Sequence, residues 1–297
     1  MTSTQPLPDD LDFVLDAPQP PLAAVPDEIE ALPEEPVQSP GSELFAKLRA
    51  RLLPRGLQAL AGANLYQTLS ESEAEAEPEQ QGDAGPDMEA AVRVEDTLLM
   101  REGLRPTDTV LEFGSRTGRL AVRVIPALQG GHYIGIDISA SMLQQARSRV
   151  SVSLGKPPCR VTWMHQKSTV FPLGNATVDI LCCYAAFTHV EPEDVFRYLR
   201  NARRIVKPKG KLLFTFLPLT HAAARRAFLD STRLELAERW TKQRTFPSSQ
   251  DLMTQLARMA GWEPQHTYRG QDRVPAALND ETSALVGTTI VLVNGEK

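Results

Sequence analysis

The chain has few cysteines, and this scarcity narrows the kinds of protein that it can be. Its 297 residues include only Cys159, Cys182 and Cys183. Neighbouring side chains in a strand point to opposite faces, so Cys182 and Cys183 are not expected to bond to each other. None of the three has the spacing of a metal ligand, and no metal site is expected. These features favour a reducing, cytoplasmic location.

Long hydrophobic segments are also missing. No apolar run approaches the roughly 20 residues that a membrane span requires. The first residues, Met1–Pro6, have neither the basic nor the apolar region of a secretory signal. There is no internal repeat. With 42% hydrophobic residues, the chain is still long enough for one large α/β domain with extensions.

Basic residues are scarce in the first third of the chain. Residues 1–89 hold 18 Asp and Glu against four Lys and Arg, a net charge of −14, whereas residues 90–297 carry +9. Residues 1–42 are rich in proline and acids and contain no Lys or Arg, which predicts a disordered acidic tail. An amphipathic helix and an acidic linker are expected at 43–87. The main domain is therefore predicted at 88–297.

Strands and helices are expected to alternate through this main domain. After a helix at 88–102, apolar strands are predicted at 109–113, 133–137, 161–165, 178–184, 211–217, 262–269 and 286–293. Helical patterns begin near Thr117 and Ser139 and cover 192–206 and much of 221–261. Such alternation is typical of βαβ units, a parallel sheet and right-handed crossovers.

The segment 110–119, Val-Leu-Glu-Phe-Gly-Ser-Arg-Thr-Gly-Arg, joins the first strand to the next helix. Gly114 permits a tight turn, and Gly118 lets the helix begin close to a ligand. Asp137 ends the second strand, where a carboxylate can accept hydrogen bonds from ribose hydroxyls. Ligands of doubly wound sheets bind outside the carboxyl ends of the strands. This order of elements predicts a nucleoside-containing cofactor.

A third glycine is absent from the loop, which argues against a dinucleotide. A pyrophosphate site has the spacing G-x-G-x-x-G, whereas this loop has only Gly114 and Gly118. Glu112 precedes them, and an acid there would repel pyrophosphate. It suits a cationic ligand, such as the sulfonium and amino groups of S-adenosylmethionine (SAM).

These motifs resemble those of the class I SAM-dependent methyltransferases with a UbiE/type-11-like core. The resemblance covers about residues 88–295 and is carried by segments 110–120, 134–139, 171–181, 187–190 and 202–212. It implies a Rossmann-like, seven-stranded sheet of order 3-2-1-4-5-7-6, with the last strand antiparallel and helices on both faces. It also implies SAM as the cofactor and methyl transfer to a small-molecule acceptor.

The resemblance further assigns cofactor-binding residues. Glu112 and the loop of Gly114, Ser115, Arg116 and Gly118 would face the methionine part of SAM. Asp137 would hold the ribose, Ile138 would lie against adenine, and Tyr184 would lie near the methionine end.

Arg116 departs from the family pattern, because it stands where the loop normally has its middle glycine. If this position needs a positive φ, a non-glycine residue costs roughly 1 kcal/mol there. The long side chain either occupies cofactor space or points outward. Two alternatives to an active small-molecule enzyme therefore stay open. One is a catalytically weakened binding or regulatory protein, and the other is a methyltransferase acting on RNA or protein.

His189 is the candidate catalytic residue, because it follows the fourth strand near the expected entry of the acceptor. It would act there as a general base. The competing interpretation is that it caps or packs against the next helix. The sequence identifies neither the acceptor nor the oligomeric state.

A basic stripe runs along the helix predicted at 192–206 and into the next strand. Its members are Arg197, Arg200, Arg203, Arg204, Lys207, Lys209 and Lys211. Such a stripe can bind the phosphates of a nucleic acid. A solvated outer face is the commoner explanation, and no interleaved aromatics support base stacking. The acidic tail is a further candidate to cover it.

Overall fold

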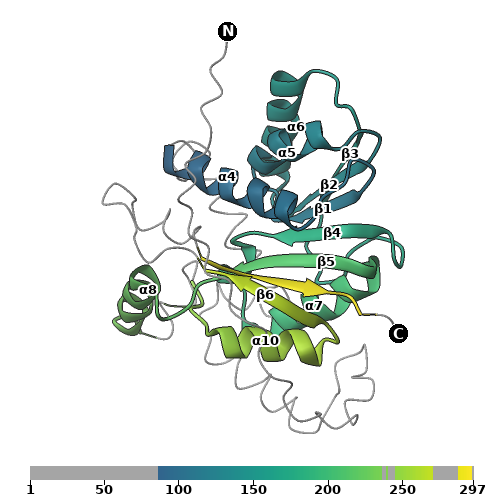
Figure 1. Ribbon diagram of the computed structural model, residues 1–297. Helices are drawn as coiled ribbons and strands as arrows, with labels where there is room; N and C mark the ends of the chain where they lie inside the picture. The colour runs from purple at the N-terminus through teal and green to yellow at the C-terminus, as the bar shows by residue number, and fades with distance from the viewer. Residues whose placement is uncertain (1–85, 236–238, 240–244, 270–286, 296–297) are drawn as a thin grey trace, which may run out of the picture.

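The computed structural model describes residues 86–235, 239, 245–269 and 287–295 (Figure 1). The predicted tail at 1–42 lies outside these residues, as does nearly all of the helix and linker predicted at 43–87. Among the described residues, no helix combines the length and the hydrophobicity needed to cross a bilayer.

The elements alternate as the periodicity predicted. The strands are β1 (Thr109–Phe113), β2 (His132–Asp137), β3 (Arg160–His165), β4 (Val178–Cys183), β5 (Val206–Phe216), β6 (Glu263–Tyr268) and β7 (Thr288–Val293). The α-helices are α4 (Pro86–Arg101), α5 (Arg119–Val124), α6 (Ala140–Leu154), α7 (Pro192–Ile205), α8 (Ala222–Thr232) and α10 (Gln250–Met259). Two short 3-10 helices complete the set, η1 (Ile125–Ala127) and η2 (Ala186–His189).

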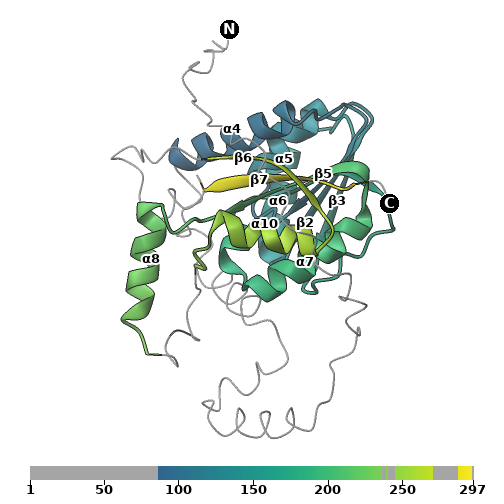
Figure 2. The ribbon, with the colours of Figure 1, turned by 60° about the horizontal axis from the view of Figure 1, so that its bottom comes forward.

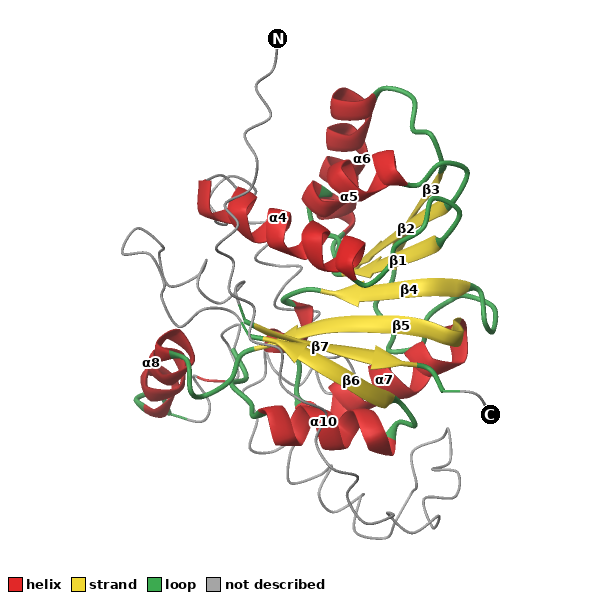
Figure 3. Cartoon of the chain, in the orientation of Figure 1, coloured by secondary structure: helices red, strands yellow, loops and turns green. Residues whose placement is uncertain are grey.

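All seven described strands form one sheet of order β3-β2-β1-β4-β5-β7-β6, which confirms the predicted order. Parallel pairing joins β1 to β2 and β4, β2 to β3, and β4 to β5, whereas β7 runs antiparallel to β5 and β6. The arrowheads in Figure 3 show β4 and β7 pointing in opposite directions. The sheet therefore has two distinct ends, and β1, β2 and β4 deliver their carboxyl ends to the same one.

Helices cover both faces of the sheet, as Figures 1 and 2 show. On one face, α4, α5 and α6 lie side by side, and their apolar side chains bury Val110, Tyr133 and Cys182. On the other face, α7 and α10 bury Leu111, Ile134 and Phe214. The alternation of buried neighbours such as Val110 and Leu111 follows from the two-residue period of a strand. Both layers exclude water from the sheet that carries the functional residues.

The fifth strand differs from the prediction at its start. A turn at 208–210 followed by a strand at 211–217 was expected, but β5 begins at Val206 and runs to Phe216. The pairing with β4 shifts between Val178 and Ile180, and Lys209 adopts a φ of 64° inside β5. The irregular residues are thus part of the strand, because β4 continues to pair on both sides of them.

Candidate functional site

The loop between β1 and α5 has three residues with positive φ. Gly114 has a φ of 82°, Arg116 of 44° and Gly118 of 74°. A Cβ on Gly118 would lie only 2.9 Å from the backbone of Ala146 in α6, so glycine also lets α5 and α6 pack closely. The position of Arg116 does require the left-handed region, which fits the glycine found there in the family pattern.

Asp137, at the end of β2, fastens this loop to the sheet. Its Oδ2 accepts a hydrogen bond from the backbone N of Arg116 at 2.8 Å, and its Oδ1 accepts one from the backbone N of Ser139 at 2.9 Å. The side chain is buried, and burial raises its pKa, although these two bonds and the charge of Arg116 act in the opposite direction. The residue predicted to hold the ribose thus also shapes the loop.

Glu112 lies on the adjacent strand β1, opposite Gly135 and two residues short of Asp137, and is buried as well. The phenolic oxygen of Tyr133 donates a hydrogen bond to its Oε2. Burial raises the pKa of Glu112 well above its usual range, and the charges of Glu95 and Asp137 add to the effect, whereas the bond from Tyr133 opposes it. This buried carboxyl therefore favours any ligand that brings a positive charge.

Gly135, two residues after Tyr133 on β2, makes room for the ring of Trp163. It pairs with Glu112 on β1 and with Trp163 on β3. A Cβ on Gly135 would lie 2.4 Å from the indole of Trp163, so the ring occupies the space that a side chain would fill. The rings of Trp163 and Tyr133 are 5.6 Å apart.

Glu95 of α4 is the site residue that the sequence analysis missed. Its partly buried carboxyl has a pKa raised to about 8 by burial, with the charge of Arg116 as the opposing influence. A signal was present in the sequence, because Glu95 falls at helical spacing between Val92 and Leu98, which are both buried. An acid within the apolar stripe of a helix is a candidate for a functional site.

The guanidinium of Arg116 is close enough to these acids to lower the pKa of both Glu95 and Asp137. The positive charge of Arg116 therefore acts on two of the three acids, Glu95 and Asp137. The acidic group of Glu95, Glu112 and Asp137 lies at the carboxyl ends of β1 and β2 and beneath α4.

The other predicted residues gather around the same end of the sheet. Ser115 is buried, and its hydroxyl has no hydrogen-bond partner among the residues that the structure describes. Ile138 follows Asp137 directly, and its carbonyl lies 2.8 Å from Nε2 of His165. The hydroxyl of Tyr184 donates to the backbone oxygen of Glu95 at 3.3 Å, so Tyr184 lies under α4.

His189 is the last residue of η2, the short helix that follows β4. Its side chain is partly exposed, while the preceding Thr188 is buried and donates to the carbonyl of Ala185. The described part of the chain contains no group of three or more His, Cys, Asp or Glu side chains placed to hold a metal ion.

Comparison with known proteins gives matches over this same region. A family model described as "Methyltransferase domain" matches residues 110–210, from β1 into β5. The 2-phytyl-1,4-naphthoquinone methyltransferase of Trichormus variabilis is 27% identical over 142 residues, which is 46% of this chain and 60% of that protein. A mitochondrial ribosomal RNA small subunit methyltransferase of Arabidopsis thaliana is 36% identical over 59 residues, 20% of this chain and 15% of the relative. The chain thus spans less than two thirds of these relatives.

Solved structures share the fold at low sequence identity. Magnesium protoporphyrin IX methyltransferase from Synechocystis PCC 6803, with bound S-adenosylhomocysteine, has a TM-score of 0.59 at 14% identity. The match covers 77% of this chain and 100% of the Synechocystis chain. A Haloferax volcanii methyltransferase in complex with the Trm112 activator has a TM-score of 0.56 at 19% identity, covering 77% and 97%. The predicted resemblance is thereby confirmed: residues 110–210 match a methyltransferase domain, and the surrounding sheet has the class I SAM-dependent methyltransferase fold.

Proposed function

We propose that this protein binds SAM at the carboxyl ends of β1 and β2 and transfers its methyl group to a small-molecule acceptor. The observation that carries the proposal is the acidic group of Glu95, Glu112 and Asp137 beside the loop from Gly114 to Gly118. Three carboxyls in one buried place disfavour an anionic ligand and favour a cationic one.

The residues present fit SAM by the chemistry of their donor set. Asp137 would accept from the ribose hydroxyls, Ile138 would contact adenine, and Glu112 and Glu95 would face the cationic methionine part. The orphaned Ser115 hydroxyl would gain a partner. The bound cofactor supplies a methyl group already activated by its sulfonium. The protein has then to align the acceptor with it, and His189 is the candidate to remove a proton where the acceptor requires this.

Two measurements on the full chain test the proposal. Isothermal titration calorimetry should detect binding of SAM, with NAD⁺ as the dinucleotide control that should not bind. Incubation with methyl-labelled SAM and a panel of quinones and porphyrins, chosen from the substrates named for the relatives, should then give labelled product. Absence of SAM binding at high protein concentration would refute the proposal.

The affinity for SAM should rise with pH below 7.5. The pKa of Glu95 is raised to about 8, so the ligand-free protein holds a proton there that a cation would displace. For one such group, affinity should increase roughly eightfold from pH 6.5 to 7.5. Titrations in Hepes and Tris would show proton release as a difference in heat. Glu95→Gln should flatten the dependence, and a pH-independent wild type would contradict the assignment.

Arg116 supports the alternative of a catalytically weakened protein, because its guanidinium already neutralises part of the acidic group. Arg116→Gly should therefore bind SAM about tenfold more tightly, since it removes a competing cation. Arg116→Lys keeps the charge and should stay near the wild-type affinity. Calorimetric titration of wild type, Arg116→Gly and Arg116→Lys with SAM measures these affinities. Weaker binding by Arg116→Gly would mean instead that the arginine contacts the cofactor.

A nucleic-acid substrate has less support. The match to the ribosomal RNA methyltransferase covers only 15% of that relative. Several side chains of the predicted basic stripe are paired within the fold: Arg197 with Asp194 at 3.2 Å, Lys207 with Asp179 at 2.7 Å and Lys211 with Glu102 at 2.8 Å. The stripe therefore offers fewer available charges to phosphates than the sequence alone suggested.

A further inference from the structure

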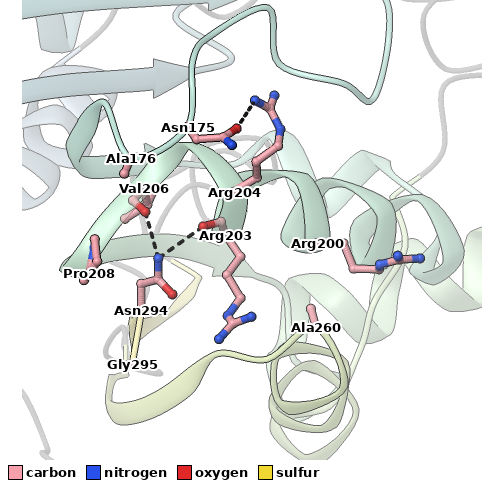
Figure 4. A pocket seen from close by; sticks show the side chains of 10 residues that line it. All are labelled: Asn175, Ala176, Arg200, Arg203, Arg204, Val206, Pro208, Ala260, Asn294 and Gly295. Carbon is pink, nitrogen blue, oxygen red and sulfur yellow. Dashed lines mark hydrogen bonds between the residues drawn. The ribbon is translucent and has the colours of Figure 1, made fainter. Parts of the chain in front are cut away.

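A cavity of about 450 Å³ opens at the end of the sheet opposite the candidate cofactor site (Figure 4). It lies where β4 and β5 begin and β7 ends, against the last turn of α7. Its polar lining includes Asn175, Arg200, Arg203, Arg204 and Asn294. Ligand cavities of proteins commonly have about 300–1,000 Å³, so the space suits a small molecule.

The three arginines of this cavity differ in what they already bind. Arg204 donates to the carbonyls of Phe171 and Leu173 at 2.8 and 2.7 Å and to Oδ1 of Asn175 at 3.0 Å. These hydrogen bonds hold the loop before β4 against α7. Figure 4 shows Arg204 turned toward Asn175.

Arg203 has no such partners among the described residues. Within these residues, its buried Nε has no hydrogen bond and its guanidinium forms no ion pair. It packs against Gly261, where a Cβ would lie 2.9 Å from its Cζ. Arg200, one turn earlier, is exposed, and its guanidinium carbon lies over the ring of Phe196, 5.9 Å from the centroid. A buried, unpartnered donor is costly and points to a missing acceptor.

Capping of α7 does not account for these charges. The carbonyls at the end of the helix have other donors. The indole of Trp262 donates to Leu199 at 2.8 Å, the amide of Asn294 to Arg203 at 3.1 Å, and the backbone N of Ala176 to Arg204 at 3.0 Å. Because the helix end is already satisfied, Arg200 and Arg203 remain available to a ligand.

We propose that this cavity binds a small phosphate ester, held by the guanidinium groups of Arg203 and Arg200. Guanidinium presents paired donors that match phosphate oxygens. Asn175 accepts from Arg204 with its oxygen, which leaves its amide nitrogen as a further donor. The site is separate from methyl transfer, because it occupies the other end of the sheet.

Glu263 adds a negative charge beside this site. Its carboxylate lies against Gly295 at the wall of the cavity, and its side chain is exposed. Its negative charge repels an anionic ligand, but its side chain does not occupy the cavity. Glu263→Gln should therefore strengthen binding, by about threefold for a solvent-screened charge.

The test measures the thermal stability of the full chain with inorganic pyrophosphate or phosphate against sodium chloride of equal ionic strength. Pyrophosphate should raise the Tm by about 3 °C above the chloride control. Arg203→Gln should lose this increment, and Arg200→Gln should reduce it. Arg197→Gln is the matched control, because Arg197 lies on the same helix outside the cavity, and it should keep the increment.

Other outcomes overturn the proposal. An equal rise in Tm in Arg203→Gln and the wild type would show that pyrophosphate does not bind in this cavity. An equal rise in Tm with chloride would show an effect of ionic strength alone. An RNA oligonucleotide that binds more tightly than pyrophosphate and depends on Arg197 would indicate a nucleic-acid surface instead. If Arg203→Gln does not fold, Arg200→Gln carries the same test, because it removes an exposed side chain.

Discussion

Replacing Asp137 by asparagine is expected to weaken SAM binding about 100-fold. One carboxylate oxygen accepts from the backbone of Arg116 and the other from that of Ser139. An amide group retains only one acceptor oxygen, so one of these bonds is lost and the loop from Gly114 to Gly118 is released. The carboxylate that we propose to accept from the ribose hydroxyls is removed as well. Calorimetric titration with SAM measures the change.

Asp108→Asn is the matched control for this variant. Asp108 is also buried, and its Oδ2 accepts from the backbone N of Arg105 at 2.8 Å, but it lies just before the amino end of β1. Its replacement should lower thermal stability and leave the affinity for SAM within about twofold. If both variants lost affinity equally, Asp137 would act through stability alone, and its assignment to the cofactor would be withdrawn.

Replacing Glu102 by alanine should lower the free energy of unfolding by about 3 kcal/mol. Glu102 follows α4 and is buried. One oxygen accepts from Lys211 of β5 at 2.8 Å, and the other accepts from Tyr268 at 2.5 Å and meets His266 at 2.8 Å, both on β6. The side chain thus joins the helix over the candidate cofactor site to two strands, and its loss leaves several polar groups without this partner. Denaturant or thermal unfolding of both proteins measures the change.

The pH dependence of this difference has a defined sign. Burial tends to raise the pKa of Glu102, but the hydrogen bonds from Lys211, Tyr268 and His266 outweigh it and hold the pKa below its ordinary value of 4.5. A lowered pKa means that the contribution is complete above pH 4.5 and disappears as the pH falls further. Wild type and Glu102→Ala should therefore converge in acid. Glu263→Ala, an exposed acid on the same β6, should change stability by less than about 0.5 kcal/mol.

The fold was predictable because its signals are local. Short apolar segments predicted every described strand, and the loop from Gly114 to Gly118 with Asp137 indicated a nucleoside site from the sequence alone. The sheet order came from the resemblance to a family. Strand boundaries near Lys209 were less predictable, because continued pairing with β4 decides where β5 begins.

The missed features depend on contacts between distant segments. Glu95 joins the candidate site because α4 packs over β1, and Tyr133 of β2 reaches Glu112 of β1 because the two strands are paired. The pairing of Lys207 with Asp179 bridges 28 positions of sequence. The tertiary fold decides which charged side chains pair across such sequence separations. The spacing of charges along one helix therefore could not show which arginines remain available to a ligand.

The indole of Trp163 lies over Gly135 and beside the ring of Tyr133, whose hydroxyl bonds to Glu112. We expect the fluorescence emission of a tryptophan so placed to depend on the charge state of that carboxyl, because only the phenol of Tyr133 lies between them. Its emission spectrum therefore supplies an intrinsic optical probe for occupancy of the acidic site. Trp262 packs on the opposite face of the sheet, so its emission is not expected to change with such occupancy.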